Sequence, residues 1–367
     1  MHSSSSHDLH SIFARFAVCG DYLHAEPYGS GHINDTYRVL CHQAGVEVPY
    51  LLQRINHHIF TRPLELMDNI SRVTAHLQDR LAGHPDATRH ALRLIPTLAD
   101  DAPAHQDGDG NWWRMYYFIT NAHTHDVIRS PKQAYQAAHA FGLFQRQLAD
   151  LPGGRLHETI PNFHNTPARF ANFARALAED AHGRACEARA EIAFVLDREP
   201  LAGVLLDLNA RGEIPERVTH NDTKINNVML DDVTGEGICV IDLDTVMPGL
   251  ALYDFGDLVR TSTSPAAEDE TDLGKVVMQM PMYEALLAGY LKACGDILVP
   301  AEKAHLAFSG KLITLEIGVR FLTDFLQGDV YFKTKRPRHN LDRCRTQFAL
   351  VADIERHEKT MNALVGK

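Results

Sequence analysis

The segment of residues 218–244 constrains the fold more than any other part of the chain, because a β-hairpin pattern and several polar side chains coincide in it. Two short apolar runs, VML and ICVI, flank a turn with two glycines, and this pattern predicts an antiparallel hairpin. If Val228 pairs with Ile241, Asn227 lies opposite Asp242. Directly opposed residues have Cβ atoms about 4.5–5.5 Å apart, so an amide oxygen and a carboxylate can share one hard cation there.

A further polar residue, Asp222, precedes Asn227 by five positions and falls in the loop that leads into the hairpin. A carboxylate at that place can accept the proton of an attacking hydroxyl group. The order of His220, Asp222, Asn227 and Asp242 follows the kinase pattern H-R-D-x-x-x-x-N, in which a later aspartate binds the metal. The segment therefore predicts an ATP- and Mg²⁺-dependent phosphotransferase with Asp222 as the catalytic base and Asn227 and Asp242 as metal ligands.

Two more aspartates follow the hairpin. Asp244 comes two positions after Asp242, and on a continuing strand the two carboxylates share a face. We therefore expect Asp244 to contact a second Mg²⁺, with a loop-bracing or helix-capping role as the alternative. Asp254 enters a helical pattern and is expected to brace the catalytic loop through backbone hydrogen bonds rather than to bind metal.

The chain of 367 residues is long enough for two lobes with separate cores. Strand patterns fill residues 21–28, 32–41, 48–55, 91–98 and 112–119, and one helix is predicted over residues 63–81. Helical patterns then follow at residues 130–148, 167–181, 184–196, 252–261, 273–293, 302–326 and 341–364. We expect an α+β, protein-kinase-like two-lobe fold: a small β-rich nucleotide-binding lobe over residues 1–120, and a larger helical lobe with the catalytic loop over residues 121–367.

Composition limits the partners of the protein. Hydrophobic content of 45% and charged content of 23% are ordinary for a globular chain, and a net charge of -11 argues against nucleic acid as a partner. No apolar run approaches the length of a membrane span, and the N-terminus lacks the pattern of a signal peptide. The six cysteines contain no CxxC pair, which fits free thiols in a reducing compartment. We expect a cytoplasmic protein without membrane contact.

Three segments are candidates for nucleotide binding. Gly29, Ser30 and Gly31 form a turn whose small residues let backbone amides approach phosphate groups. The third strand lacks the lysine that holds ATP phosphates in kinases, so either Gln53 or Arg54 takes its position, since alternate residues face opposite sides. The last strand of the first lobe ends at the lobe boundary, where a hinge backbone would hydrogen-bond adenine, so Tyr117, Phe118 and Ile119 are hinge candidates by position.

The stretches PYGSGHIND, YLLQRIN, HNDTKINNVML, IDLDTVMPGLALYDFGDLVR and EIGVRFLTDFLQGDVYF together span most of the chain. They resemble the aminoglycoside phosphotransferase and choline kinase superfamily, and within it most closely the N-acetylhexosamine 1-kinases. The resemblance implies transfer of the ATP γ-phosphoryl group to the anomeric hydroxyl of N-acetylglucosamine or N-acetylgalactosamine. It also implies that His32, Arg320 and Tyr331 contact the sugar together with Asp222.

Two departures from the wider superfamily stand out. Asn221 occupies the position before the base where glycine is usual, and the third strand has no lysine. In the sugar-contacting region, Arg320 and Tyr331 are eleven residues apart, so we expect Gly328 to end the helix and let Tyr331 fold back.

Two other readings stay open. The same catalytic residues could phosphorylate an aminoglycoside, a choline-like amine or homoserine instead. Both tryptophans, Trp112 and Trp113, lie in the first lobe, which disfavours an aromatic cage for choline. A nucleotide-binding regulator that has lost catalysis is the remaining alternative, and the intact set of Asp222, Asn227 and Asp242 argues against it.

Overall fold

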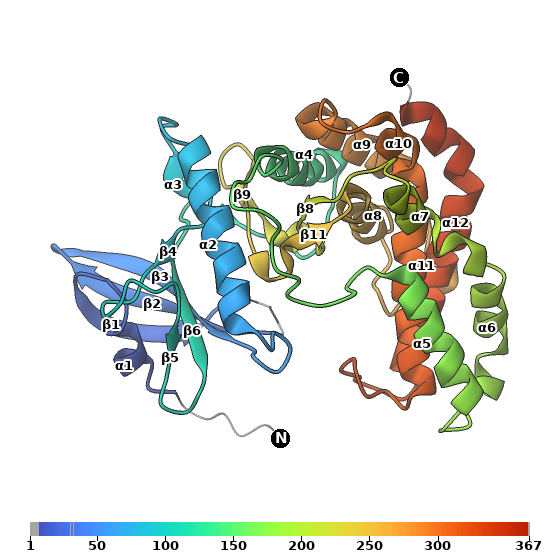
Figure 1. Ribbon diagram of the computed structural model, residues 1–367, viewed down its shortest axis with the longest axis horizontal. Helices are drawn as coiled ribbons and strands as arrows, with labels where there is room; N and C mark the ends of the chain where they lie inside the picture. The colour runs from blue at the N-terminus through green and yellow to red at the C-terminus, as the bar shows by residue number, and fades with distance from the viewer. Residues whose placement is uncertain (1–6, 30, 32, 366–367) are drawn as a thin grey trace. The chain divides into compact units, whose positions relative to one another are not determined.

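The computed structural model describes residues 7–29, 31 and 33–365, and its backbone divides into two compact units (Figure 1). The first unit comprises residues 1–122, 150–160 and 238–247, and the second comprises residues 123–149, 161–237 and 248–367. An antiparallel sheet dominates the first unit and helices dominate the second. The predicted α+β fold with a β-rich and a larger helical lobe is thereby confirmed.

The first unit is built on a sheet with the strand order β1-β2-β3-β6-β4, in which β5 also pairs with β6. Its strands are β1 (Asp21–Pro27), β2 (Asp35–Gln43), β3 (Val46–Ile55), β4 (Leu94–Ile95), β5 (His105–Gln106) and β6 (Trp112–Tyr117). Its described helices are α1 (Leu9–Phe13), α2 (Pro63–Arg80) and α3 (Ala87–His90).

The register between β3 and β6 decides which side chains enter the core of the first unit. Leu52 lies opposite Met115, and both are fully buried in the cluster that also contains Trp113. The next pair along the two strands, Gln53 and Arg114, therefore projects from the other face of the sheet.

The predicted strand over residues 91–98 is wrong in extent, because only Leu94–Ile95 pair with β6. Pro96 follows directly and has no amide N–H for a ladder. The two-residue strand β5 was not predicted.

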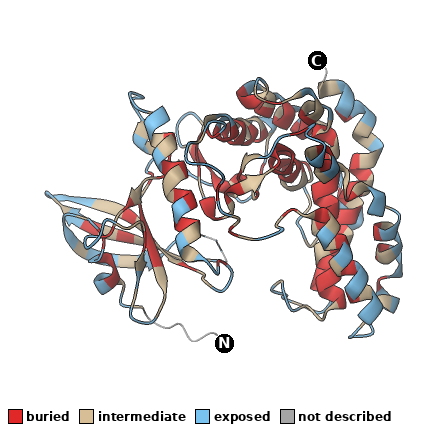
Figure 2. Cartoon of the chain, viewed as in Figure 1, coloured by how far each residue is buried: buried red, intermediate tan, exposed pale blue. Residues whose placement is uncertain are grey.

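The second unit contains nine α-helices among its described residues. They are α4 (Pro131–Gln147), α5 (Thr166–Glu179), α6 (Arg189–Leu196), α7 (Val204–Ala210), α8 (Ala251–Ser262), α9 (Met280–Cys294), α10 (Pro300–Ala304), α11 (Leu306–Leu326) and α12 (His339–Val365). Helix α11 packs against α5, α8 and α12 and is buried along most of its length (Figure 2). Where α8 crosses it, a Cβ on Gly256 would lie 2.5 Å from the carbonyl oxygen of Ser309, so the missing side chain permits the close approach.

Two helical predictions in this unit need correction. The helix predicted from residue 273 begins only at Met280. Its first turn contains Pro281, and proline suits the first turn because the backbone N–H it lacks has no partner within the helix at that position. The helix predicted over residues 302–326 is interrupted at His305, which separates α10 from α11.

The remaining strands form two small sheets with the orders β10-β9-β7 and β11-β8. These strands are β7 (Ala122–His123), β8 (Arg217–Thr219), β9 (Val228–Asp231), β10 (Gly237–Val240) and β11 (Met247–Gly249). The turn after β9 is closed by a 2.9 Å hydrogen bond from the Asp231 amide to the Glu236 carbonyl, and the predicted hairpin is present. Within residues 7–29, 31 and 33–365, no helix is both long and apolar enough to cross a membrane.

Candidate active site

The loop that contains Asp222 runs from the end of β8 to a 3-10 turn, Ile225–Asn227. Asn221 has a φ of +66° and lies in the left-handed region. Among residues with a side chain, asparagine is one of the few that enter this region readily. The required backbone conformation explains why asparagine can stand where glycine is usual.

Within this loop the Asp222 side chain lies between two partners. The Lys224 ammonium is 3.1 Å from one carboxylate oxygen, and the Asn227 amide nitrogen donates to the other at 3.1 Å. Asn227 also donates to the Asp222 carbonyl at 2.8 Å. Burial alone would lower the pKa of Lys224, but the charges of Asp222 and Asp257 and the contact with Asp222 together outweigh it, and the pKa is raised. The structure thus brings the predicted base and a predicted metal ligand together, beside a cation that the sequence reasoning missed.

Asp254 braces the loop from helix α8. It is fully buried, and it accepts hydrogen bonds from the backbone amides of His220 at 2.9 Å and Asn221 at 2.7 Å. The Gln145 side chain adds a third bond at 2.6 Å. Burial raises the pKa of Asp254, although these donors oppose the shift. The predicted bracing role is confirmed.

A second brace, Asp257, was not predicted. Its carboxylate accepts the Thr223 amide at 3.0 Å and lies 2.7 Å from the Arg260 guanidinium. Burial alone would raise the pKa of Asp257, but Arg260 and then Lys224 outweigh it and the pKa is lowered. The i, i+3 spacing of Asp257 and Arg260 on a helix was the available signal in the sequence.

In the first unit, Asp242 follows the end of β10 at Val240 and adopts a left-handed conformation with φ +58° and ψ +58°. Such backbone values are uncommon for residues with a side chain, although aspartate is among the types that adopt them most readily, and they cluster at functional sites. The chain then enters a 3-10 turn, Leu243–Thr245. The argument that Asp244 shares a strand face with Asp242 is therefore wrong, because no strand continues through these residues.

Asp244 is buried and its two carboxylate oxygens accept from different donors of the first unit. Arg114, also fully buried, forms an ion pair with one oxygen, and Asn34 donates to the other at 2.6 Å. Arg114 also donates to the Gln53 side chain at 3.0 Å. These contacts match the loop-bracing alternative for Asp244, while its contact with a second Mg²⁺ stays a prediction.

Of the two candidates on β3, Gln53 faces the side of the sheet that holds Arg114 and Asp244. Arg54 instead pairs with Asp35 through its Nε, at 2.7 Å from the carboxylate oxygen. The sequence reasoning missed Arg114, whose position depends on the β3–β6 register.

The other nucleotide-binding candidates also belong to the first unit. Gly29 has a φ of +82°, which glycine adopts without strain, and nothing lies within 4 Å of the Cβ position of Gly31. The centres of the Phe118 and Tyr28 rings are 5.2 Å apart. This contact places the predicted hinge residue beside the start of the glycine turn. Two predicted residues, Ser30 and His32, lie outside the described residues.

Gly328 ends the helix that carries Arg320 and lets Tyr331 fold back, as predicted. Helix α11 stops at Leu326, and Gly328 has a φ of +93°. The Arg320 guanidinium carbon lies 5.9 Å from the centre of the Tyr331 ring, and the Tyr331 side chain remains exposed at 69%.

The loop after α11 is held by Asp324, a buried residue that sequence reasoning did not single out. Its carboxylate accepts three successive backbone amides: Val330 at 2.9 Å, Tyr331 at 2.7 Å and Phe332 at 3.0 Å. The Asn340 side chain donates to the same carboxylate at 2.8 Å. These hydrogen bonds fix the backbone of the loop that carries Tyr331.

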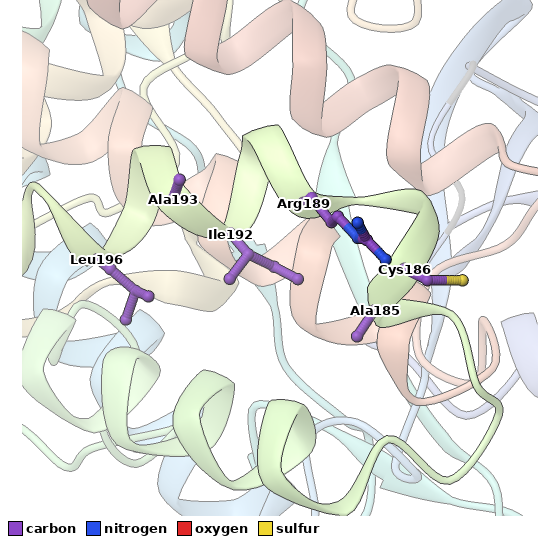
Figure 3. Close-up of a pocket in the computed structure, with 6 residues that line it drawn as sticks. All are labelled: Ala185, Cys186, Arg189, Ile192, Ala193 and Leu196. Carbon is purple, nitrogen blue, oxygen red and sulfur yellow. The ribbon is translucent and has the colours of Figure 1, made fainter.

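An open pocket of about 400 Å³ lies along α6 and the 3-10 turn before it, Ala185–Glu187 (Figure 3). Its lining residues are Ala185, Cys186, Arg189, Ile192, Ala193 and Leu196. None of the predicted site residues lines it.

Comparison with known proteins defines the class. The chain matches the phosphotransferase enzyme family over residues 24–300, and it belongs to that family. The class of protein that the fold and the site define is therefore that of the phosphotransferases.

Solved structures with the same fold include an aminoglycoside phosphotransferase from Alicyclobacillus acidocaldarius, with a TM-score of 0.65, 12% identity, and coverage of 99% of this chain and 98% of that one. A microcompartment-associated aminopropanol kinase gives a TM-score of 0.56, 15% identity, and coverage of 96% and 98%. The GDP complex of aminoglycoside 2′-phosphotransferase-IIIa gives a TM-score of 0.52 and 12% identity, with coverage of 90% of this chain and 93% of that one.

Proposed function

We propose that the protein transfers the γ-phosphoryl group of ATP to the anomeric hydroxyl of an N-acetylhexosamine. The observation that carries the acceptor assignment is the pairing of the exposed Tyr331 ring with the Arg320 guanidinium on a loop fixed by Asp324. A flat aromatic face next to a planar donor suits a neutral sugar ring with hydroxyl and acetamido groups.

In this proposal Asp222 orients the acceptor hydroxyl and takes its proton. Its two carboxylate oxygens already contact Lys224 and Asn227, so the side chain is held in one orientation. Lys224 also brings a positive charge to the place where phosphoryl transfer would occur, and phosphoryl transfer depends mainly on positioning and charge.

Asn227 and Asp242 are the proposed Mg²⁺ ligands. The Asn227 amide nitrogen donates to Asp222, so the amide oxygen points the other way, as a hard cation requires. Mg²⁺ would neutralise the charge of the nucleotide phosphates. Among residues 7–29, 31 and 33–365, no group of three His, Cys, Asp or Glu side chains offers another metal centre.

Gln53, Gly29, Ser30, Gly31 and Phe118 are the proposed contacts for the nucleotide. Gln53 supplies an amide in place of the lysine of the third strand, on the face of the sheet where it accepts a hydrogen bond from Arg114. Arg54 is a weaker candidate, because its charge is already paired with Asp35.

Charge near the proposed acceptor site argues against the cationic alternatives. The Arg169 guanidinium interacts unfavourably with that of Arg320, and burial together with this repulsion lowers the pKa of Arg169. An aminoglycoside or a choline-like amine would bring further positive charge to this region. Homoserine remains the second candidate, because its carboxylate suits Arg320.

A matched pair of measurements tests the proposal. Asp222→Asn should reduce turnover on N-acetylglucosamine and N-acetylgalactosamine by at least a thousandfold, with Mg-ATP affinity by calorimetry changed less than threefold. Turnover close to wild type would remove Asp222 from the role of base. Turnover of homoserine but of neither sugar would replace the leading acceptor with the second candidate.

A further inference from the structure

A buried histidine in the second unit touches the loop that contains Asp222. His164 is 7% exposed, and its Nε2 lies 3.1 Å from the backbone carbonyl oxygen of Asn221. Its Nδ1 lies 2.9 Å from a carboxylate oxygen of Glu316, which is fully buried on α11. The Thr166 hydroxyl donates to the other oxygen of Glu316 at 2.6 Å. None of these contacts belongs to the phosphoryl-transfer roles given above.

The chemistry of the partners determines the protons on the ring. A backbone carbonyl can only accept a hydrogen bond, so Nε2 of His164 must carry a proton. A second proton lies between Nδ1 and Glu316, and it stays on the nitrogen because an imidazole is the stronger base of the two. The ring is therefore an imidazolium paired with a carboxylate.

The pair connects two parts of the proposed site. Asn221 directly precedes Asp222, and Glu316 precedes Arg320 by one helical turn on α11. We propose that His164 is a positioning residue, whose imidazolium, paired with Glu316, fixes the Asn221 carbonyl and thereby the orientation of Asp222. This inference rests on the proposed catalytic role of Asp222.

Other groups around the pair act on its charge. Burial alone would lower the pKa of His164, but Glu316, the Asn221 carbonyl and then Asp257 raise it. Arg320 also stabilises the charged form of Glu316, and the Tyr253 ring lies 5.0 Å from the imidazole. Because the pKa of His164 is raised in the folded state, its charged pair with Glu316 stabilises the fold. This contribution is complete below the ordinary imidazole pKa of about 6.5. It is lost as the pH rises through the folded-state value.

The first test reads the protonation of His164 directly and needs no acceptor. In the ¹⁵N-histidine-labelled full chain, both ring nitrogens of His164 should carry protons at pH 7, with a midpoint above 6.5. A neutral ring at pH 7 overturns the proposal, whatever the protein phosphorylates.

The second test uses variants. His164→Gln and Glu316→Gln should speed hydrogen exchange of the Asn221, Asp222 and Thr223 amides at least tenfold. They should lower kcat at least tenfold while the KM for ATP changes less than twofold. His357→Gln serves as control, because His357 forms its hydrogen bond with the Asp353 carbonyl on α12. This variant should change neither the hydrogen exchange of the loop nor kcat.

The pH profile separates positioning from a merely structural effect. Wild-type kcat should fall at alkaline pH with the midpoint measured for the His164 ring, and this fall should be absent in His164→Gln. Loop exchange and kcat that match wild type in both variants would overturn the proposal. Failure to find any acceptor would instead reject the proposed function, while the ring protonation and loop exchange would still test the positioning role.

Discussion

Asparagine in place of Asp254 removes one negative charge from the centre of the bracing network without changing the size of the side chain. One carboxylate oxygen accepts the Asn221 amide, and the other accepts the His220 amide and the Gln145 side chain. All three partners are donors. An asparagine amide keeps one oxygen and turns the other position into a donor, so in either orientation one backbone N–H of the loop loses its acceptor.

The cost follows from this loss. A hydrogen bond to a charged group contributes about 1.5–3 kcal/mol, and a buried donor without a partner costs a similar amount. A value of about 2 kcal/mol corresponds to roughly thirtyfold in an equilibrium or a rate. We therefore expect Asp254→Asn to speed hydrogen exchange of the His220 and Asn221 amides about thirtyfold and to lower kcat by a similar factor.

Hydrogen exchange read by mass spectrometry and a coupled ADP-release assay at saturating Mg-ATP measure both effects. Asp353→Asn is the matched control, because that buried carboxylate accepts the Met278 amide and no amide of the catalytic loop. The control should leave loop exchange and kcat near wild type. Unchanged exchange and kcat in Asp254→Asn would refute the bracing argument.

Three more outcomes are expected. Gly328→Ala should raise the KM for the acceptor severalfold without changing the KM for ATP. The reason is that φ is +93° at Gly328 and a Cβ there would lie 2.6 Å from the His182 ring. Equal changes in both KM values would contradict this expectation. Arg114→Met should lower the free energy of unfolding of the first unit by about 3–5 kcal/mol in urea titration, because it leaves a buried carboxylate unpaired; an unchanged midpoint would contradict that. Burial raises the pKa of Cys239 to about 12. At pH 8 a thiol reagent should therefore label the exposed cysteines and not Cys239. Labelling of Cys239 in the native protein would show that its thiol is not buried. The exposed cysteines are Cys19 and Cys186.

Features set by short-range sequence patterns could be predicted. The hairpin after Asn227, the bracing role of Asp254 and the helix end at Gly328 each depend on turn residues, periodicity or spacing within a few tens of residues. The conformation of Asp242 did not follow from the same kind of pattern. Its left-handed backbone breaks the strand, and an apolar run followed by aspartate does not reveal where pairing ends.

Features that depend on distant parts of the chain could not be predicted. Arg114 reaches Asp244 across 130 positions of sequence, and Asn34 reaches it across 210. Arg114 faces Asp244 only because the β3–β6 register pairs it with Gln53, and a shift by one residue would turn it to the other face. Likewise, the contact of His164 with Asn221 depends on how the helical unit packs.

Phosphorus NMR of the product tests the central claim most directly. The protein is incubated with Mg-ATP and either N-acetylglucosamine or N-acetylgalactosamine, and the new phosphorus signal is examined for coupling to the anomeric proton. A sugar 1-phosphate that forms with wild-type protein and not with Asp222→Asn is the predicted result. A 6-phosphate, or no phosphorylated product from either sugar, would contradict it.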